Sequence, residues 1–337
     1  MVRTFHPVGH GAFYTERFYD DNGENTANVI FDCGCFEACK AGISSKVFEQ
    51  RIKTTIHKEF CKDTKIDALF ISHFHTDHIN GIDELLNYCQ VANLYIPCLQ
   101  DVVLVESFLY NSIIEGSEDC KSNQVLRKIA EREYNTEIDD SGRSIIPIGA
   151  WLYRSYGPSI SHSRATLIKR QIRQQLSAQI FMQNGVDFSE LSKAIARIGI
   201  DKCKTMYQQI FGNNHNSYSM TLYSGLNCLR DCLGMCHTAC LYTGDYKAKG
   251  KFAELERFYT TSLKRVYILQ VPHHGSEHNI NNKLYSPERL CVVSAGVTDK
   301  YGHPDQQTLV AIQNQRGIPI IVTEDPKTKQ VFTYNIL

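Results

Sequence analysis

The stretch His73-Phe74-His75-Thr76-Asp77-His78 decides how this sequence is interpreted. It directly follows Ile66 to Ser72, an apolar run that predicts a buried strand. The first two histidines alternate on one side of an extended chain, so both imidazoles can bind one metal ion. The aspartate and the last histidine lie one turn further on and can reach a second ion about 3.5–4 Å away, the usual separation in two-metal sites. The stretch is therefore more typical of a metal site than of surface histidines.

Three later segments also place polar side chains after a predicted strand. Thr243-Gly244-Asp245 supplies a carboxylate that can bridge two metal ions, although a turn aspartate alone would be ordinary. Pro272-His273-His274-Gly275-Ser276 has adjacent histidines, which predict one metal ligand and one neighbour that contacts substrate. In Tyr301-Gly302-His303-Pro304, the histidine by itself is a weak signal and is more typical of a capping or packing role than of a functional one.

Strands and helices are distributed unevenly along the chain. A helical region of about 100–213, with Ile168, Ile172 and Leu176 at helical spacing, separates two strand-rich halves. This order predicts a layered α/β or α+β domain. The predicted strands are Phe5–Val8, Ala12–Phe18, Val29–Phe31, Ile66–Ser72, Leu94–Ile96, Tyr218–Tyr223, Ala239–Thr243, Val266–Val271, Leu290–Ser294, Ile318–Thr323 and Val331–Tyr334.

Composition narrows the class of protein. The 337 residues include 36 basic and 36 acidic side chains, so the formal net charge is zero and gives no support for nucleic-acid binding. Hydrophobic residues make up 42% and charged residues 21%, which is typical of a globular protein. The sequence has no apolar run of transmembrane length and no apolar segment near Met1, so we expect a cytoplasmic protein without a membrane partner.

Cysteines are frequent, at thirteen, and we expect them to be reduced thiols. One cluster contains Cys33, Cys35 and Cys39. A second contains Cys228, Cys232, Cys236 and Cys240, with three residues between successive members and with His237 among them. Zinc knuckles usually bring two ligands from a shorter local motif, so we favour packing over a zinc or redox site.

Together these motifs resemble the metallo-β-lactamase-fold hydrolases, which carry H-x-H-x-D-H, a Gly-Asp and a late histidine in this order. The similarity is closest to the ComEC-type branch, the hydrolase domain of DNA-uptake competence proteins. The resemblance covers roughly residues 1–100 and 214–337. It implies an α+β fold, a single metallo-β-lactamase αββα sandwich over 1–337 with a helical insert at about 100–213. The matching motifs are Val8-Gly9-His10-Gly11, Asp32-Cys33-Gly34, Ser72 to His78, Asn214-His215-Asn216-Ser217, Thr243-Gly244-Asp245, His273 to Ser276, and Tyr301 to Pro304.

The resemblance also implies roles for individual residues. His73, His75 and a late histidine, for which we favour His273 over His274, would hold the first metal. Asp77, His78 and Asp245 would hold the second, with Asp245 bridging. Many relatives have a further histidine where this chain has Asn214, a poor ligand, and His215 could substitute. Asp32 and Ser276 are further candidates for metal or substrate contacts.

The expected activity follows from such a site. A bound metal lowers the pKa of water from about 15.7 toward 7 and supplies hydroxide at neutral pH. We expect one or two divalent metals, zinc first, with manganese or iron as alternatives. Asp77 and His303 are the expected catalytic residues, and His303 would stabilise negative charge on the substrate. The predicted function is a metal-dependent phosphodiesterase or nuclease. A hydrolase of a small ester, lactone or thioester and a non-catalytic metal-bound scaffold remain as alternatives.

The helical region carries an excess of positive charge. Residues 164–204 contain eight basic and three acidic side chains in a chain of zero net charge. Lys169, Arg170 and Arg173 could steer a nucleic acid or another phosphodiester toward the metals. The alternative is a solvated face of two amphipathic helices.

Overall fold

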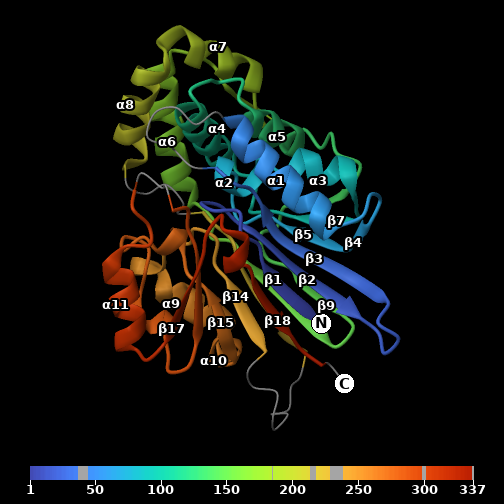
Figure 1. Cartoon of the computed structure of the whole chain (residues 1–337). Helices are drawn as coiled ribbons and strands as arrows, with labels where there is room; N and C mark the ends of the chain where they lie inside the picture. Colours follow the sequence, from blue (N-terminus) through green and yellow to red (C-terminus); the bar gives the residue numbers. More distant parts are fainter. Residues whose placement is uncertain (37–44, 184, 213–217, 228–237, 298–300, 336–337) are drawn as a thin grey trace.

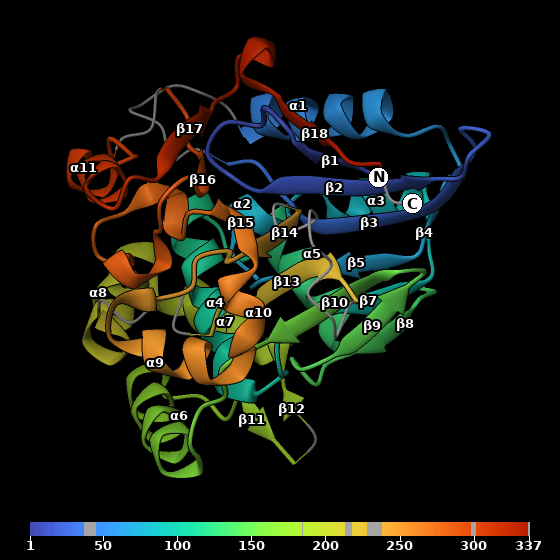
Figure 2. The ribbon, with the colours of Figure 1, turned by 90° about the horizontal axis from the view of Figure 1, so that it is seen from below.

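The computed structural model describes the whole chain except residues 37–44, 184, 213–217, 228–237, 298–300 and 336–337 (Figure 1). Two seven-stranded sheets pack against each other, and helices cover their outer faces (Figures 1 and 2). The predicted αββα sandwich is thereby confirmed. Among the described residues, every helix is too short or too polar to span a lipid bilayer.

The first sheet combines antiparallel and parallel strands. Its antiparallel part includes a hairpin between β2 and β3, and the carboxylate of Asp20 in the connecting turn accepts hydrogen bonds from the backbone amides of Asn22 and Glu24. Its parallel part runs from β3 through β5 and β7 to β8. In spatial order the strands are β18 Gln330–Thr333, β1 Val2–Phe5, β2 Phe13–Tyr19, β3 Asn25–Cys33, β5 Ala68–Phe70, β7 Asn93–Tyr95 and β8 Glu137–Asp139.

The second sheet is parallel from β14 to β17, and β13, β10 and β9 extend it with antiparallel pairs. In spatial order its strands are β17 Ile318–Val322, β16 Leu290–Ser294, β15 Val266–Gln270, β14 Ala239–Tyr242, β13 Thr221–Leu226, β10 Trp151–Tyr156 and β9 Ile145–Ile148. Two small sheets pair β4 Lys65–Ile66 with β6 Gln90–Val91, and β11 Phe181–Met182 with β12 Gly185–Val186.

The helices lie outside the two sheets. Helices α1 and α3 cover the first sheet, whereas α9, α10 and α11 cover the second (Figures 1 and 2). Their bounds are α1 Ser45–Glu59, α2 Thr76–Ile79, α3 Ile82–Tyr88, α4 Asp101–Glu115, α5 Lys121–Ala130, α6 His162–Leu176, α7 Phe188–Ile198, α8 Ile200–Ile210, α9 Ala248–Tyr259, α10 Thr261–Lys264 and α11 Gln306–Asn314. Short 3₁₀ turns occur at His273–Gly275, Asn282–Leu284 and Pro326–Thr328.

The predicted helical insert is only partly helical. Residues 100–213 contain α4 to α8, but β8 joins the edge of the first sheet, and β9 and β10 join the edge of the second. In β10, Trp151 and Tyr153 are two residues apart, lie on the same face of the strand and are buried in the core. Burial of every second residue indicates a strand, but in the sequence this pattern was hidden by the helical spacing of apolar residues in the neighbouring segments. Several strand limits also differ: β1 ends at Phe5, the run from Ile66 is divided between β4 and β5, and β13 begins at Thr221 rather than at Tyr218.

A buried polar network joins the two sheets. Arg3 on β1 donates through Nε to Glu16 on β2 at 2.6 Å. Glu16 also accepts hydrogen bonds across the interface from Tyr153 (2.5 Å), Ser224 (2.7 Å) and Tyr242 (2.8 Å). Removing one partner of a buried ion pair typically costs about 3–5 kcal/mol. These contacts therefore favour one alignment of the sheets, and so one relative position of the loops at their ends.

Candidate metal centre

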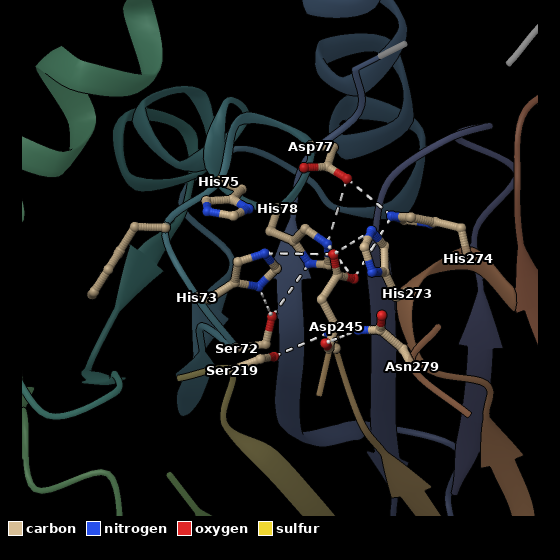
Figure 3. Close-up of polar contacts among 12 residues, drawn as sticks. Ser72, His73, His75, Asp77, His78, Ser219, Asp245, His273, His274 and Asn279 are labelled. Atoms are coloured by element: carbon tan, nitrogen blue, oxygen red, sulfur yellow. Dashed lines mark hydrogen bonds and ion pairs between the residues drawn. The ribbon is translucent and has the colours of Figure 1, made fainter. Parts of the chain in front are cut away.

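The predicted site residues converge where several strands end. His73 and His75 follow β5, Asp245 follows β14, and His273 and His274 follow β15. Strands β14 and β15 are parallel, so their carboxyl ends open at the same edge of the sandwich, and Figure 3 shows these side chains pointing toward one another. The tertiary fold thus brings together residues that lie up to 200 positions apart.

Asp245 stands at the middle of the group. Its Oδ1 lies 3.2 Å from His78 Nε2 and 3.7 Å from His274 Nε2. Its Oδ2 lies 3.7 Å from His73 Nε2 and 3.6 Å from His273 Nε2. The two oxygens of one carboxylate therefore face two different pairs of histidines, which is the arrangement that a bridging ligand requires (Figure 3).

One side of this group is the more compact. Ligand atoms of Asp77, His78, Asp245 and His274 all lie within 4.8 Å of one another. His274 Nε2 approaches Asp77 Oδ2 to 2.9 Å, and its Nδ1 is 2.8 Å from the carbonyl oxygen of Ser294. His274, the less favoured of the two late histidines as a metal ligand, thus joins the residues expected to hold the second metal. The carbonyl of Ser294 fixes the direction of its ring, which the sequence does not reveal.

The other side contains the remaining histidines. His73 and His75 have ring centroids 4.5 Å apart, and His273 faces the same oxygen of Asp245 as His73 does. The structure therefore places both late histidines at the centre, one on each side of Asp245.

The donor set fits divalent metal ions. Nε2 of His73 and Nε2 of His78 are both buried; Nε2 of His73 makes no hydrogen bond with the residues that the structure describes, and Nε2 of His78 faces the carboxylate of Asp245 at 3.2 Å. Buried nitrogens without partners are costly unless another group satisfies them. Imidazole nitrogens and carboxylate oxygens are the ligands that zinc, manganese and iron accept. The two nitrogens face different oxygens of Asp245, so one metal ion at each oxygen would satisfy both.

Asp32 orients His78 directly and His73 through the hydroxyl of Ser72. Its Oδ2 is 2.8 Å from His78 Nδ1 and accepts a hydrogen bond from the Ser72 hydroxyl at 2.7 Å, and its Oδ1 accepts from the Ser72 amide at 2.6 Å. The same hydroxyl lies 3.0 Å from His73 Nδ1. A carboxylate can only accept, so the proton of His78 belongs on Nδ1; the hydroxyl donates to Asp32 and accepts from Nδ1 of His73. Both Nε2 atoms are left with a lone pair for metal. Asp32 thus positions the ligands from outside the cluster.

Close packing of the loops makes glycine necessary at two positions. Gly244 has φ +51°, and a Cβ there would lie 2.4 Å from Cβ of Ser72. A Cβ on Gly34 would lie 2.4 Å from the carbonyl oxygen of Asp77. The backbone of Asp245 is held on both sides, since its amide donates to Ser219 Oγ at 3.0 Å and its carbonyl accepts from Asn279 at 2.9 Å. A side chain at either glycine would displace a candidate ligand.

In the metal-free protein, the charged groups of the site shift one another's pKa values. Burial alone would raise the pKa of Asp77 and Asp245, but the neighbouring histidines hold both pKa values below their usual range. Burial alone would lower the pKa of His78, but Asp77, Asp245 and Asp32 raise it well above its usual value. Burial and the adjacent histidines lower the pKa of His73. Without metal, the carboxylates therefore stay ionised and His78 is a cation, with a second proton on Nε2 beside the one on Nδ1; a metal at Nε2 would displace that second proton.

Two further histidines border the centre. The ring centroid of His303 lies 6.1 Å from that of His273 and 6.2 Å from that of His10. His10 Nε2 is 3.8 Å from Asp77 Oδ2, and its ring lies 3.8 Å from that of His274. The sequence marked this motif only by its glycines, so His10 was missed as a site residue. Asn214 and His215 lie outside the described residues.

The remaining predicted site residues are Ser276 and the basic side chains of α6. Ser276 is buried, and its amide donates to the carbonyl of His273, closing the turn. Lys169 forms an ion pair with Asp101, and the charged groups of Lys169 and Arg173 lie 5.1 and 5.3 Å from the ring of Phe181. Part of the predicted steering charge is therefore locally neutralised, whereas Arg170 is exposed.

The cysteines that the structure describes in the two clusters are packing residues. Cys33 and Cys35 are buried in the core beneath the first sheet, and Cys240 on β14 is buried between the sheets. Cys39, Cys228, Cys232 and Cys236 lie outside the described residues.

Comparison with known proteins agrees with this geometry. The family model of the metallo-beta-lactamase superfamily matches residues 22–97, which include the histidine motif after β5. Over this segment the chain is similar to the superfamily. A similar sequence, the anti-Pycsar protein Apyc1 of Bacillus phage BSP38, is 28% identical over 115 residues, which cover 32% of this chain and 39% of that protein. The match thus spans well under two thirds of the relative's length.

Solved structures similar to the chain have low sequence identity. A possible metal-dependent hydrolase from Veillonella parvula DSM 2008 is 8% identical with a TM-score of 0.41, covering 99% of this chain and 100% of that one. A long form RNase Z from yeast is 10% identical with a TM-score of 0.38, covering 96% of this chain and 36% of that one.

Proposed function

We propose that the chain is a metal-dependent hydrolase of phosphodiesters, either a phosphodiesterase or a nuclease. The observation that carries the proposal is Asp245, whose two oxygens face separate pairs of buried histidines. Sites that hold two metals through a shared carboxylate are suited to in-line displacement at phosphorus, because both the attacking and the leaving oxygen are stabilised.

Specific residues would hold the metals. One ion would be bound by Asp77, His78 and His274, and the other by His73, His75 and His273, with Asp245 between them. Divalent ions, zinc by preference and manganese or iron as alternatives, supply Lewis acidity when bound and lower the pKa of water toward about 7.

The protein's own groups prepare the site for this chemistry. Asp32 and Ser72 fix the protonation of His73 and His78, so that both present a lone pair. His10 and His303 at the border can donate hydrogen bonds to charged oxygens of a substrate. The side chains of the candidate ligands are buried except those of Asp77, 13% exposed, and His273, 19% exposed, which leave an approach for substrate.

The phosphodiester assignment rests on motif similarity as well as geometry. The ComEC-like set of motifs, which extends from Val8-Gly9-His10-Gly11 to Tyr301-Gly302-His303-Pro304, supports a nucleic acid or another phosphodiester as substrate. A small ester, lactone or thioester is the second candidate, and the pairing of Lys169 with Asp101 favours it, because charge neutralised by a local partner steers polymers weakly. A metal-bound scaffold without activity would share the same centre.

One panel of substrates tests these alternatives. Purified protein loaded with zinc or manganese is assayed against bis(p-nitrophenyl) phosphate, single-stranded DNA, RNA and a lactone, with and without chelator. We expect chelator-sensitive hydrolysis of the phosphodiesters and its loss in Asp245→Asn. Hydrolysis of the lactone alone would establish the second candidate. Tight binding of metal without hydrolysis of any substrate would favour the scaffold.

A further inference from the structure

Helix α4 of the central region contacts the histidine motif along one helical face. Asn111 Nδ2 donates to the carbonyl oxygen of Phe74 at 2.9 Å, and the Thr76 hydroxyl donates to Asn111 Oδ1 at 3.1 Å. Between these two contacts lies His75, whose ring stacks on Tyr110 with centroids 3.8 Å apart and an interplanar angle of 15°. The backbone on both sides of His75 and the face of its ring are therefore held by α4.

The same helix directs a buried carboxylate at His75. Glu106, 2% exposed, lies one turn before Tyr110, and its Oε1 is 3.5 Å from His75 Nε2. That oxygen also accepts a hydrogen bond from the hydroxyl of Tyr207 on α8, and Oε2 accepts one from Ser107 at 3.3 Å. A buried carboxylate needs such partners, because isolating its charge from water is costly.

This geometry has a consequence for the protonation of His75. A carboxylate facing Nε2 favours a proton on that nitrogen and leaves the lone pair on Nδ1. Histidines that bind metal through one nitrogen usually donate the other N–H to a carboxylate, a carbonyl or water, which fixes the ring and strengthens the ligand. His73 and His78 obtain this support from Asp32 and Ser72, whereas His75 has Glu106.

We propose that Glu106, supported by Tyr207, is a positioning residue that orients His75 for one of the two metals. The inference rests on the proposed function, because it assumes that the centre binds metal. The central region then contributes directly to the metal centre through α4. Only the ion held by His75 depends on Glu106, because the compact group of Asp77, His78, Asp245 and His274 does not include His75 or Glu106.

The test is the affinity of each metal ion in Glu106→Gln, a substitution that keeps the shape of the side chain and removes its charge. Zinc is titrated into metal-free, full-length protein against a chromophoric chelator. We expect one of two binding events to weaken by about 10- to 100-fold, the usual loss for an outer partner of a metal ligand. The other event should be unchanged. Tyr207→Phe, which removes a hydrogen bond to Glu106, should weaken the same event to a smaller degree.

A matched control is Asp101→Asn. This carboxylate lies at the start of the same helix but pairs with Lys169, so both binding events should remain at wild-type affinity. In cobalt-loaded protein, the visible absorption should change in Glu106→Gln and not in Asp101→Asn. If Glu106 served only to join α4 to α8, Glu106→Gln would destabilise the metal-free protein and leave both affinities and the cobalt spectrum unaltered.

The outcomes separate this inference from the proposed function. Two unaltered zinc affinities in a folded Glu106→Gln overturn the inference, whatever the substrate panel shows. Equal weakening of both events also overturns it, because the effect would not be specific to His75. If Glu106→Gln does not fold, an unaltered pair of affinities in Tyr207→Phe overturns it instead. Two metals with selective weakening, but no hydrolysis in the panel, support the inference and reject the proposed activity.

Discussion

Replacing Asp32 by Asn changes one atom behind the metal centre and reverses a hydrogen-bond pattern. In the wild type, Oδ2 of Asp32 accepts from both His78 Nδ1 and the Ser72 hydroxyl, at 2.8 and 2.7 Å. If the amide nitrogen occupies this place, it can only donate. His78 must then present a lone pair at Nδ1 and carry its proton on Nε2, the atom that faces Asp245. Asparagine tolerates the left-handed backbone of Asp32, φ 56°, so the variant tests hydrogen bonding without backbone strain.

The expected magnitude follows from these contacts. The hydrogen bond of Ser72 N to Oδ1 can persist, whereas two bonds to a charged acceptor are removed or weakened, each worth about 1.5–3 kcal/mol. Relief from burying a carboxylate offsets part of this loss, and burial does raise the pKa of Asp32. We expect the metal-free protein to lose about 2 kcal/mol and remain folded. Zinc affinity should fall by about 10- to 100-fold, equivalent to about 1.4–2.7 kcal/mol.

Two measurements check the reasoning. Chelator competition gives the zinc affinity, and denaturant unfolding of chelator-treated protein gives the stability. The control is Asp67→Asn, since this carboxylate accepts a hydrogen bond from the amide of Asn28 away from the metal centre. That variant should lose stability without losing zinc affinity. Wild-type zinc affinity in Asp32→Asn would refute the protonation scheme for His78.

Three further results are expected. Asp245→Ala should lose bound metal and activity while staying folded, as elemental analysis and circular dichroism would show; full metal content would refute the bridging role. Neighbouring carboxylates raise the pKa of His78 in the metal-free protein. The second proton of His78 therefore stabilises the metal-free fold at low pH, and this stabilisation is lost as the pH rises through the raised pKa. Zinc binding must release the same proton. Calorimetry in two buffers should therefore show proton release and zinc affinity that rises with pH; no release would contradict this. If the substrate is nucleic acid, changing Lys169, Arg170 and Arg173 to Gln should make binding less dependent on salt. The log–log slope should become shallower by about 0.9 for each duplex phosphate that the variant no longer neutralises. Hydrolysis of bis(p-nitrophenyl) phosphate should stay unchanged.

The sequence was informative wherever a local pattern has one physical meaning. Alternating ligands after an apolar run placed His73 and His75 at the end of a strand, and β5 ends just before them. The apolar run Leu290–Ser294 was located to the residue, because a buried parallel strand needs apolar side chains on both faces. The edge strands β8 and β9 were missed, because their exposed and half-buried side chains carry a weak pattern.

The sequence by itself determined a layered domain of strands and helices, the ligand types and the strand ends that carry them, and the resemblance of its motifs implied the sandwich. Only the tertiary structure decided how those ligands are grouped: which oxygen of Asp245 faces which histidines, that His274 belongs with Asp77, and that Glu106 lies behind His75. Spacing along the chain sets which side chains can meet within one strand or one turn. Distances between segments up to 200 residues apart depend on how the sheets and helices pack, and packing is a property of the whole fold.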